Sequence, residues 1–240
     1  MAGLSAGDGR SFDSGEYVPS DEEFEIEYMA EPQDRYHEHR LYPLLIGEVL
    51  NNTYRVEHKL GHGGFSTVWM AQDMRDKTYV ALKIVESGSA GDCGLAIQEE
   101  LVRSVPDTSE LLVCKDTYTL STPHGVHRVL VFPLQGPNLR DRPAFTIGLS
   151  SRMSAALQVP QALKSLRDGG IVHRYINSAN IMFGIEPLEN YSSADDRLIL
   201  GDFGVPIKAG TSVTQKVQSP SYYYALERLH GHDPTFATEM

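Results

Sequence analysis

Apolar and polar residues alternate over residues 54–60, Tyr-Arg-Val-Glu-His-Lys-Leu, as they do in a half-buried strand. This run leads into Gly61-His-Gly-Gly64, and a second strand-like run follows over residues 65–71. The pattern predicts a hairpin with the glycines in its turn.

A third strand is predicted over residues 79–85, Tyr-Val-Ala-Leu-Lys-Ile-Val. Side chains alternate along a strand, so Ala81 and Lys83 share one face and the larger apolar side chains share the other. We therefore expect three antiparallel strands in a meander, with one face of the sheet available to cover a ligand or another part of the protein.

The next part of the chain predicts one helix and two strands. Residues 94–105 have apolar residues near helical spacing, and Pro106 ends that run. Residues 111–118 and 126–132 resemble strands, and the proline and glycine residues that follow indicate a linker at residues 133–138.

The remainder predicts a helix over residues 152–167 and short strands at 171–172 and 198–200. Strands with one helix, a linker, and then a helix with short strands are typical of a bilobal α+β fold with a hinge. The expected parts are an arm (1–34), an N-terminal extension (35–52), a small β-rich lobe (53–132), a hinge (133–138) and a partial, helical second lobe (139–240).

Composition supports a folded protein with an acidic arm. The chain has 240 residues, 41% hydrophobic, and a net charge of −11. Residues 1–34 contain 10 acidic residues and 1 basic residue, whereas residues 35–240 contain 22 and 20. The arm has few branched apolar residues, so we expect it to be disordered. A solvating tail is the first interpretation of the arm, and a docking segment is the alternative.

The nearly neutral remainder indicates no direct nucleic-acid binding. Two cysteines, Cys93 and Cys114, are too few for a disulfide scaffold or a four-cysteine zinc site. The sequence has no signal-peptide pattern and no run approaching 18 apolar residues. We expect an intracellular protein, cytoplasmic or nuclear or both, without a membrane partner.

The glycine hairpin and Lys83 together suggest a phosphate site. Glycines let the backbone approach a phosphate and point its N–H groups at it. Lys83, one strand further on, projects into the space that the hairpin covers. Each feature has an ordinary alternative, because a GxGG hairpin is more often only a tight turn and a mid-strand lysine normally extends to solvent. Ser66 also replaces the third glycine of a GxGxxG pattern.

Two later segments are more specific. Residues 171–183 form a polar loop between apolar stretches, and residues 198–204, Leu-Ile-Leu-Gly-Asp-Phe-Gly, form a strand that ends in an aspartate within a glycine-flanked turn. Asn180 and Asp202 supply two hard oxygen ligands suited to a Mg²⁺ ion that accompanies a nucleotide. Taken alone, residues 202–204 would be an ordinary turn.

In order and spacing, these motifs resemble the signatures of protein kinases. They are Gly61-x-Gly63, Val-Ala-Leu-Lys83, His173-Arg174 with Asn180, Asp202-Phe-Gly204, and Ala225-Leu-Glu227. The amino-acid sequence is especially similar to those of the SR-protein kinases and their fungal relatives. That similarity lies in residues 35–37, 45–56, 59–69, 131–139 and 223–227, and it extends over about residues 35–240.

The resemblance implies an α+β, bilobal kinase-like fold that binds ATP and Mg²⁺, with Lys83 at the α- and β-phosphates and Asn180 and Asp202 holding metal. Pro133 lacks an N–H but keeps its carbonyl as an acceptor for the adenine amino group. The residues implied around the nucleotide are Leu60, Gly61, His62, Gly63, Gly64, Phe65, Ser66, Thr67, Val68, Ala81, Lys83, Phe132, Pro133 and Gln135.

A glutamate of the helix over residues 94–105 should hold Lys83 in such a fold. Gln98, Glu99 and Glu100 all fit that position, so the choice stays open.

Departures from the kinase pattern concern phosphoryl transfer. Tyr175 occupies the position of the catalytic aspartate, and a phenol with a pKa of about 10 is a poor proton acceptor at neutral pH. Asn177 replaces a lysine and supplies no charge. Met240 lies where a long central helix should begin. Lys83, Asp202 and Tyr175 are therefore the residues expected at the catalytic positions.

The sequence leads to one principal hypothesis and two alternatives. The first is a serine/threonine protein kinase that transfers the γ-phosphate of ATP to protein serine or threonine, with Arg/Ser-rich proteins as the suggested substrates. The second is a catalytically impaired pseudokinase that acts as a nucleotide-binding or scaffold module. The third is an unrelated α+β domain with accidental motifs.

Overall fold

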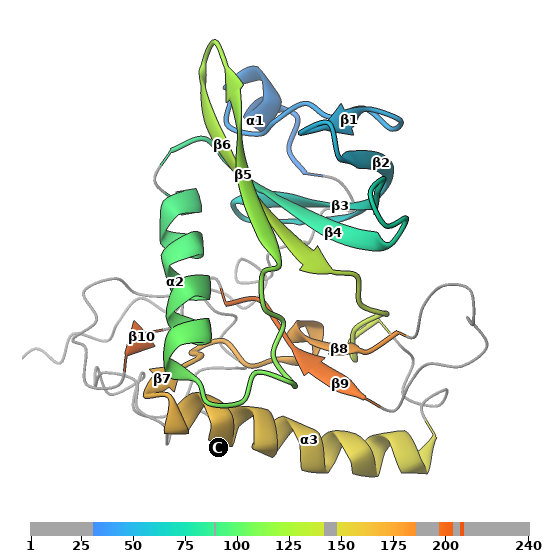
Figure 1. Ribbon diagram of the computed structural model, residues 1–240, viewed down its shortest axis with the longest axis vertical. Helices are drawn as coiled ribbons and strands as arrows, with labels where there is room; N and C mark the ends of the chain where they lie inside the picture. Colours follow the sequence, from blue (N-terminus) through green and yellow to red (C-terminus); the bar gives the residue numbers. More distant parts are fainter. Residues whose placement is uncertain (1–30, 89, 142–147, 186–196, 204–206, 209–240) are drawn as a thin grey trace, which may run out of the picture.

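Two lobes form the part of the chain that the structure describes. Figure 1 shows this computed structural model, in which helix α2 (Ala90–Ser104) stands beside a β-sheet lobe and helix α3 (Leu149–Asp168) lies along the bottom of the lower lobe. The α+β, bilobal class expected from the sequence is confirmed. The described residues are 31–88, 90–141, 148–185, 197–203 and 207–208.

The upper lobe is built on a six-stranded antiparallel sheet in the order β1-β2-β3-β4-β6-β5. The predicted hairpin, the third strand and the strand over residues 126–132 are all confirmed. The six strands are β1 (Val49–Leu50), β2 (Tyr54–Gly63), β3 (Ser66–Asp73), β4 (Tyr79–Val85), β5 (Asp116–Thr122) and β6 (Gly125–Pro133).

The strand predicted over residues 111–118 is wrong in its first half, because β5 begins at Asp116. Leu111 instead forms a parallel bridge with Leu200, and the N–H of Leu112 donates to the carbonyl oxygen of Leu200 at 2.8 Å. Leu111 is buried in the core of the lower lobe. The apolar run therefore packs into this second core instead of extending the sheet.

The two faces of the sheet differ in their surroundings. Leu82 and Ile84 of β4 are buried in the core of the upper lobe together with Trp69 of β3. Ala81 and Lys83 point to the other face and are only half-buried. This alternation follows from the period of two along a strand, and it leaves the second face turned toward the lower lobe.

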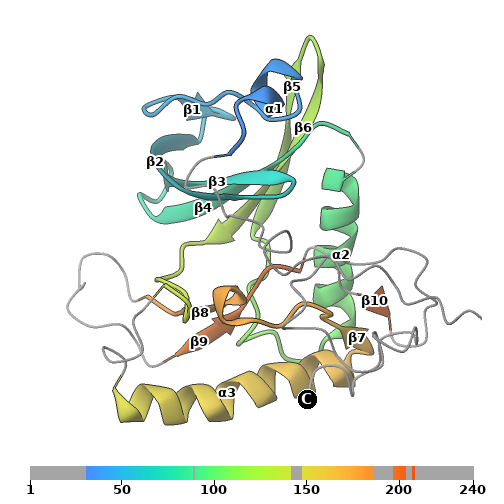
Figure 2. The ribbon, with the colours of Figure 1, turned by 180° about the vertical axis from the view of Figure 1, so that it is seen from behind.

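Helix α3 and four short strands surround the core of the lower lobe. Strand β8 (Ile181–Phe183) pairs with β9 (Leu198–Leu200), and β7 (Ile171–Val172) pairs with β10 (Ile207–Lys208). Figure 2 shows from behind that α3 lies beneath these strands, with β7 near its C-terminal end. The helices predicted over residues 94–105 and 152–167 correspond to α2 and α3.

Residues 31–34, at the end of the predicted acidic arm, lie against the sheet lobe. Glu31 is 9% exposed and forms an ion pair with Lys59 of β2. The short helix α1 (Asp34–His37) follows directly. The rest of the predicted arm, residues 1–30, lies outside the described residues. In the described ranges, none of the helices combines the length and apolar character that a membrane span requires.

Pro160 lies inside α3 and has no N–H to donate to the preceding turn. A proline in a helix interior costs about 3 kcal/mol, because it removes a hydrogen bond and its ring crowds that turn. We predict that Pro160→Ala raises the free energy of unfolding by about 1–3 kcal/mol. Urea denaturation followed by circular dichroism measures this, with Pro106→Ala, just beyond α2, as a control without the gain. Unchanged or lower stability of Pro160→Ala would contradict the prediction.

Candidate functional site

The glycine hairpin, residues 61–66, joins β2 to β3, and its pairing continues to Gly63 opposite Ser66. A Cβ atom added at Gly61 or Gly64 would meet no atom within 4 Å, and neither residue has a left-handed φ. The local fold therefore does not require glycine at these two positions. The absence of side chains would let a ligand such as a phosphate approach the backbone closely.

A row of paired residues crosses the sheet from the glycine hairpin to Lys83. Gly61 lies opposite Val68, and Val68 lies opposite Lys83. Residues paired across neighbouring strands share a face, so Lys83 extends from the same face as the hairpin. Its Nζ lies 2.9 Å from Oδ1 of Asp202 in the lower lobe. The two predicted catalytic groups thus meet where the lobes face each other.

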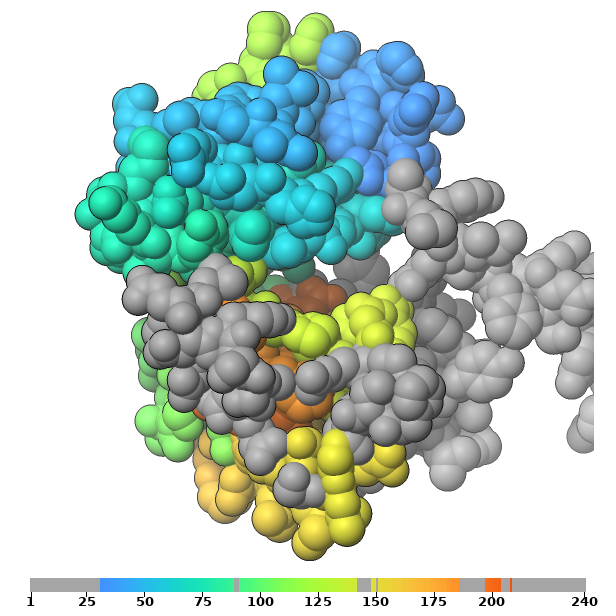
Figure 3. Space-filling model, turned by 90° about the vertical axis from the view of Figure 1, so that its right-hand side faces the viewer, coloured from blue at the N-terminus to red at the C-terminus, as the bar shows by residue number. Residues whose placement is uncertain are grey.

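The next row brings together the residues predicted around adenine. Ala81 lies opposite Phe132, which is 7% exposed, and Pro133 ends β6 directly after it. The Nε2 of Gln135 donates to the carbonyl oxygen of Pro133 at 3.4 Å. Figure 3 shows the surface hollowed below the sheet, above the yellow-green residues that follow β6.

Other residues predicted around the nucleotide differ in how far they are buried. Thr67 is buried on the opposite face, where its Oγ1 accepts a hydrogen bond from Nε1 of Trp69 at 3.1 Å. Leu60 and Phe65 are exposed, and His62 is half-buried. The alternation along β3 separates Thr67 from Val68 and Lys83.

Asp202 lies two residues after the end of β9, beyond Gly201, and adopts a left-handed conformation with φ of 58°. A non-glycine residue rarely adopts this conformation, and such strain is concentrated at functional sites. The ammonium of Lys83 holds the pKa of Asp202 below its usual range, although burial opposes this shift. The Asp202 side chain is 44% exposed, so its ionised carboxylate can be reached from solvent.

Asn180 is held beside Asp202 by hydrogen bonds. Its carbonyl oxygen accepts from the N–H of Gly201 at 2.8 Å, and its Nδ2 donates to the carbonyl oxygen of Tyr175 at 2.9 Å. The second bond fixes the orientation of the Asn180 amide. Carboxylate and amide oxygens, completed by phosphate oxygens and water, are a ligand set that suits Mg²⁺. Asn180 and Asp202 therefore fit the metal that the resemblance implies.

Among the residues that the structure describes, His, Cys, Asp and Glu side chains do not form a group of three that could hold a metal ion by themselves. Any Mg²⁺ at Asn180 and Asp202 would therefore depend on ligands from the nucleotide and water.

His173 connects the loop over residues 173–177 to the segment around Asp202. It is fully buried, its Nε2 lies 3.0 Å from the carbonyl oxygen of Gly201, and its ring lies 4.8 Å from that of Phe203. Burial lowers the pKa of His173, although its hydrogen bond with the carbonyl of Gly201 opposes this shift. These contacts fix the position from which Asp202 reaches Lys83.

The backbone of Tyr175 is the point at which the polar groups of this loop meet. Its carbonyl oxygen accepts from Asn180, and its N–H donates to Nδ1 of His173 at 3.3 Å. Asn177 caps the 3₁₀ turn Ser178–Asn180, because its Oδ1 accepts from the N–H of Ala179 at 2.8 Å. None of these bonds involves the phenol.

Lys83 is paired with Asp202 and not with the three residues considered on α2. Gln98 is buried and accepts a hydrogen bond from a backbone N–H ahead of β5 at 2.9 Å. Glu99 is exposed. Glu100 forms ion pairs within α2 and with the lysine of β10. Within the described ranges, Asp202 is the acidic partner of Lys83.

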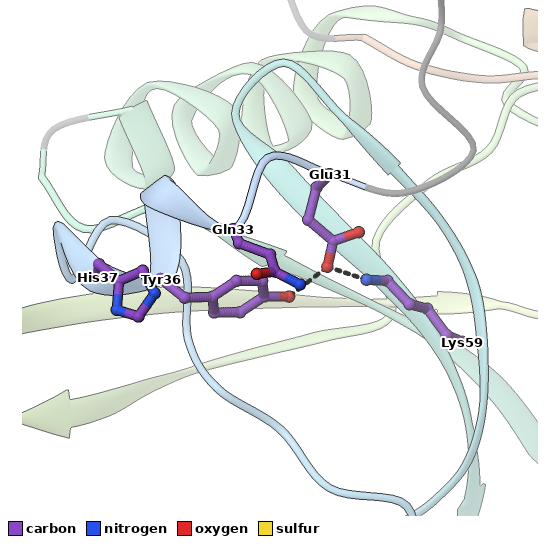
Figure 4. A pocket seen from close by; sticks show the side chains of 5 residues that line it. All are labelled: Glu31, Gln33, Tyr36, His37 and Lys59. Atoms are coloured by element: carbon purple, nitrogen blue, oxygen red, sulfur yellow. Dashed lines mark hydrogen bonds and ion pairs between the residues drawn. The ribbon is translucent and has the colours of Figure 1, made fainter.

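A separate hollow of about 420 Å³ lies beside β2, lined by Glu31, Gln33, Tyr36, His37 and Lys59. Figure 4 shows Tyr36 and Lys59 reaching the carboxylate of Glu31. The hollow is outside the predicted nucleotide site, and sequence reasoning missed these contacts because the arm was assessed by its composition. The predicted motif residues Gly204 and 225–227 lie outside the described residues.

The motifs and the geometry agree with a comparison against protein families. The family described as the protein kinase domain matches residues 54–240. This match covers most of the chain and includes both Lys83 and Asp202. The chain therefore belongs to the protein kinase family.

Similar proteins include serine/threonine-protein kinases related to the SR-protein kinases. Serine/threonine-protein kinase spk-1 of Caenorhabditis elegans is 32% identical over 182 residues, which is 71% of this chain and 18% of that protein. Serine/threonine-protein kinase SRPK of Physarum polycephalum is 35% identical over 135 residues, 54% of this chain and 30% of that protein. SRSF protein kinase 3 of Mus musculus is 33% identical over 120 residues, 47% of this chain and 21% of that protein. The chain thus spans less than a third of the length of each of these three relatives.

The Glu31 carboxylate provides a test of the contacts in Figure 4. Burial alone would raise its pKa, but hydrogen bonds from Lys59 and Tyr36 lower it from 4.5 to about 2. A lowered folded-state pKa stabilises the fold above the unfolded value, and this contribution is lost as the pH falls from 4.5 toward 2. We predict that Glu31→Gln lowers the free energy of unfolding at pH 7 by about 1–3 kcal/mol, and that the difference from wild type diminishes below pH 4.5.

Urea denaturation at a series of pH values measures this difference. Glu57→Gln is the matched control, because Glu57 pairs with Arg55 at the surface of β2, where such pairs contribute about 0–1 kcal/mol. If the difference in the free energy of unfolding between wild type and Glu31→Gln stayed the same below pH 4.5, the lowered pKa of Glu31 would be contradicted.

Proposed function

We propose that this chain binds ATP together with Mg²⁺ between its two lobes and transfers the γ-phosphate to serine or threonine hydroxyls of proteins. The proposal rests on one observation, the 2.9 Å approach of Lys83 Nζ to Asp202 Oδ1 on the face of the sheet that contains the glycine hairpin. Opposite charges at this point provide one partner for phosphate oxygens and one for the metal that accompanies them.

The chain's own residues would divide the work of binding. The N–H groups of the glycine hairpin and the ammonium of Lys83 would bind phosphate oxygens, while Asn180 and Asp202 would hold Mg²⁺. A bound Mg²⁺ ion would neutralise negative charge on the phosphates. Ala81 and Phe132 would border the adenine, and the carbonyl of Pro133 would accept from its amino group once Gln135 yields its long 3.4 Å hydrogen bond.

We predict that Mg·ATP raises the thermal unfolding temperature of the full chain by about 5–10 °C at roughly 100 times its Kd, since a ligand that binds only the folded state stabilises it. Lys83→Met should remove most of this shift, because the phosphates lose their cationic partner. Differential scanning fluorimetry with and without Mg·ATP measures the shift for each variant.

Lys115→Met is the matched control for this experiment, because Lys115 is exposed immediately ahead of β5. Its nucleotide-induced shift should equal that of the wild type. No shift in a folded wild-type sample, or the same shift in Lys83→Met, would exclude the nucleotide site.

A second candidate function is nucleotide binding without turnover, and Tyr175 favours it. A positioned general base typically contributes about 10²–10⁴ to the rate of proton transfer. Tyr175 offers a phenol where the family pattern expects a carboxylate, and Asn177 serves as a local cap without a charge for the transferring phosphate. Both departures affect transfer, because neither residue belongs to the sheet face that would hold the nucleotide.

We predict that Tyr175→Asp raises the single-turnover rate of phosphoryl transfer by about 10²–10⁴, because it restores a carboxylate without removing the backbone bonds at this position. The mouse relative is named as an SRSF protein kinase. We propose a substrate of the same kind for this chain and therefore choose an Arg/Ser-rich peptide as the acceptor. Transfer of ³²P from labelled ATP to that peptide measures the rate.

Tyr175→Asn is the matched control, because asparagine has the shape of aspartate but does not act as a base. It should show no rate increase. Equal rates for both variants and the wild type, with Mg·ATP bound in all three, would favour the module without turnover.

A further inference from the structure

The tip of the glycine hairpin is in contact with the N-terminal segment, which we define as residues 31–40. The guanidinium of Arg35 donates a hydrogen bond to the carbonyl oxygen of Gly64. Gly64 is exposed at the turn, and the cross-strand pairing of the hairpin ends at Gly63 and Ser66. Arg35 therefore fixes a backbone group that the sheet itself leaves unpaired.

A second connection reaches the hairpin through the end of β4. The N–H of Glu86 donates to the carbonyl oxygen of Phe65 at 2.9 Å. The carboxylate of the same residue accepts from Nε and Nη2 of Arg40 at 3.1 and 2.8 Å. Consecutive carbonyls of the turn, at Gly64 and Phe65, are thus connected to two arginines of the N-terminal segment, one directly and one through Glu86.

A third connection lies at the base of the hairpin on β2. Lys59 forms an ion pair with Glu31, and its Nζ lies 5.2 Å from the centre of the Trp69 ring on β3. Figure 4 shows Glu31 and Lys59 with Tyr36 of the same segment. The N-terminal segment therefore contacts β2, the turn of the hairpin and the end of β4.

The N-terminal segment is itself attached firmly to the sheet lobe. The carbonyl oxygen of Arg35 accepts from the N–H groups of Arg40 and Leu41 at 2.9 and 3.2 Å, and the carbonyl oxygen of Arg40 accepts from the N–H of Ser87 at 3.0 Å. Leu41, directly after the segment, is 2% exposed. Arg35 thus extends from a fixed backbone to the exposed turn.

From these contacts we propose that Arg35 is a positioning residue for the glycine hairpin, ordering its tip before a ligand arrives. Glycines have the largest backbone freedom to lose, so a turn that contains Gly63 and Gly64 is costly to order on binding. Ordering it in advance reduces that cost and increases affinity for whatever the backbone N–H groups bind. The inference rests on the proposed function in one respect, namely that the ligand includes the phosphates of ATP.

Two measurements on the full chain test this proposal. The first is hydrogen exchange of the hairpin amides, residues 61–66, without nucleotide, where Arg35→Ala should exchange about threefold to tenfold faster than wild type. The second is calorimetric titration with Mg·ATP and with adenosine. Arg35→Ala should weaken Mg·ATP binding by about threefold to tenfold and leave adenosine binding unchanged, because only the phosphates contact the hairpin.

Two further variants separate positioning from loss of structure. Arg35→Lys keeps a cationic donor and should recover part of the lost affinity. Arg55→Ala removes an arginine of β2 whose partners are Glu57 and Gln72, and it should change neither measurement. Equal loss of ATP and adenosine binding in Arg35→Ala would indicate general damage and overturn the proposal.

The outcomes distinguish this inference from the proposed function. Unchanged exchange in Arg35→Ala would overturn the positioning role, whatever the nucleotide results. Faster exchange with unchanged Mg·ATP affinity would overturn its link to binding. A folded wild type that binds no Mg·ATP would overturn the proposed function, and the exchange measurement would still decide whether Arg35 orders the hairpin.

Discussion

The ion pair between Lys83 and Asp202 determines how the two lobes of this protein kinase domain combine into one site. The two residues are 119 positions apart in sequence, one on a central strand and the other just after β9. Both side chains are partly exposed, so the pair contributes little to stability. Its importance is geometric, because it brings a cation and a carboxylate together below the glycine hairpin. If an anionic ligand arrived with a metal ion, the anion could replace Asp202 as the partner of Lys83, and the metal could replace Lys83 as the partner of Asp202. Neither charge would then be left unpaired.

Much of the scaffold around this pair follows from local sequence pattern. The alternation over β2, β3 and β4 predicts both the strands and the face from which Lys83 extends, since a strand that buries one side must expose the other. The run at Leu111 was less predictable, because a short apolar stretch has the same pattern whether it continues a sheet or packs into a different core. Its bridge with Leu200 depends on a contact distant in sequence.

The partners within the site depend even more on tertiary structure. The sequence placed three candidates near Lys83 on α2, but the orientation of that helix directs Gln98 to a backbone amide and Glu100 to the lysine of β10. Composition likewise predicted disorder through residue 34, although Glu31 is held by Lys59. An average over an acidic segment does not reveal that one of its carboxylates meets a lysine from a strand nearly thirty residues later.

The arrangement also separates the residues that we propose to bind a nucleotide from the loop in which the chain departs from the kinase pattern. The groups suited to hold phosphates lie on the sheet, where Lys83 and the glycine hairpin belong to paired strands. The departures from the kinase pattern lie in the loop that contains Tyr175, and there the hydrogen bonds to His173 and Asn180 use only its backbone. The bond that Asn180 donates is to the backbone carbonyl oxygen of residue 175, a group that every residue type has. Under the proposed function, the absence of a carboxylate at position 175 would therefore affect phosphoryl transfer and not the groups proposed to bind the nucleotide, since the two depend on different atoms.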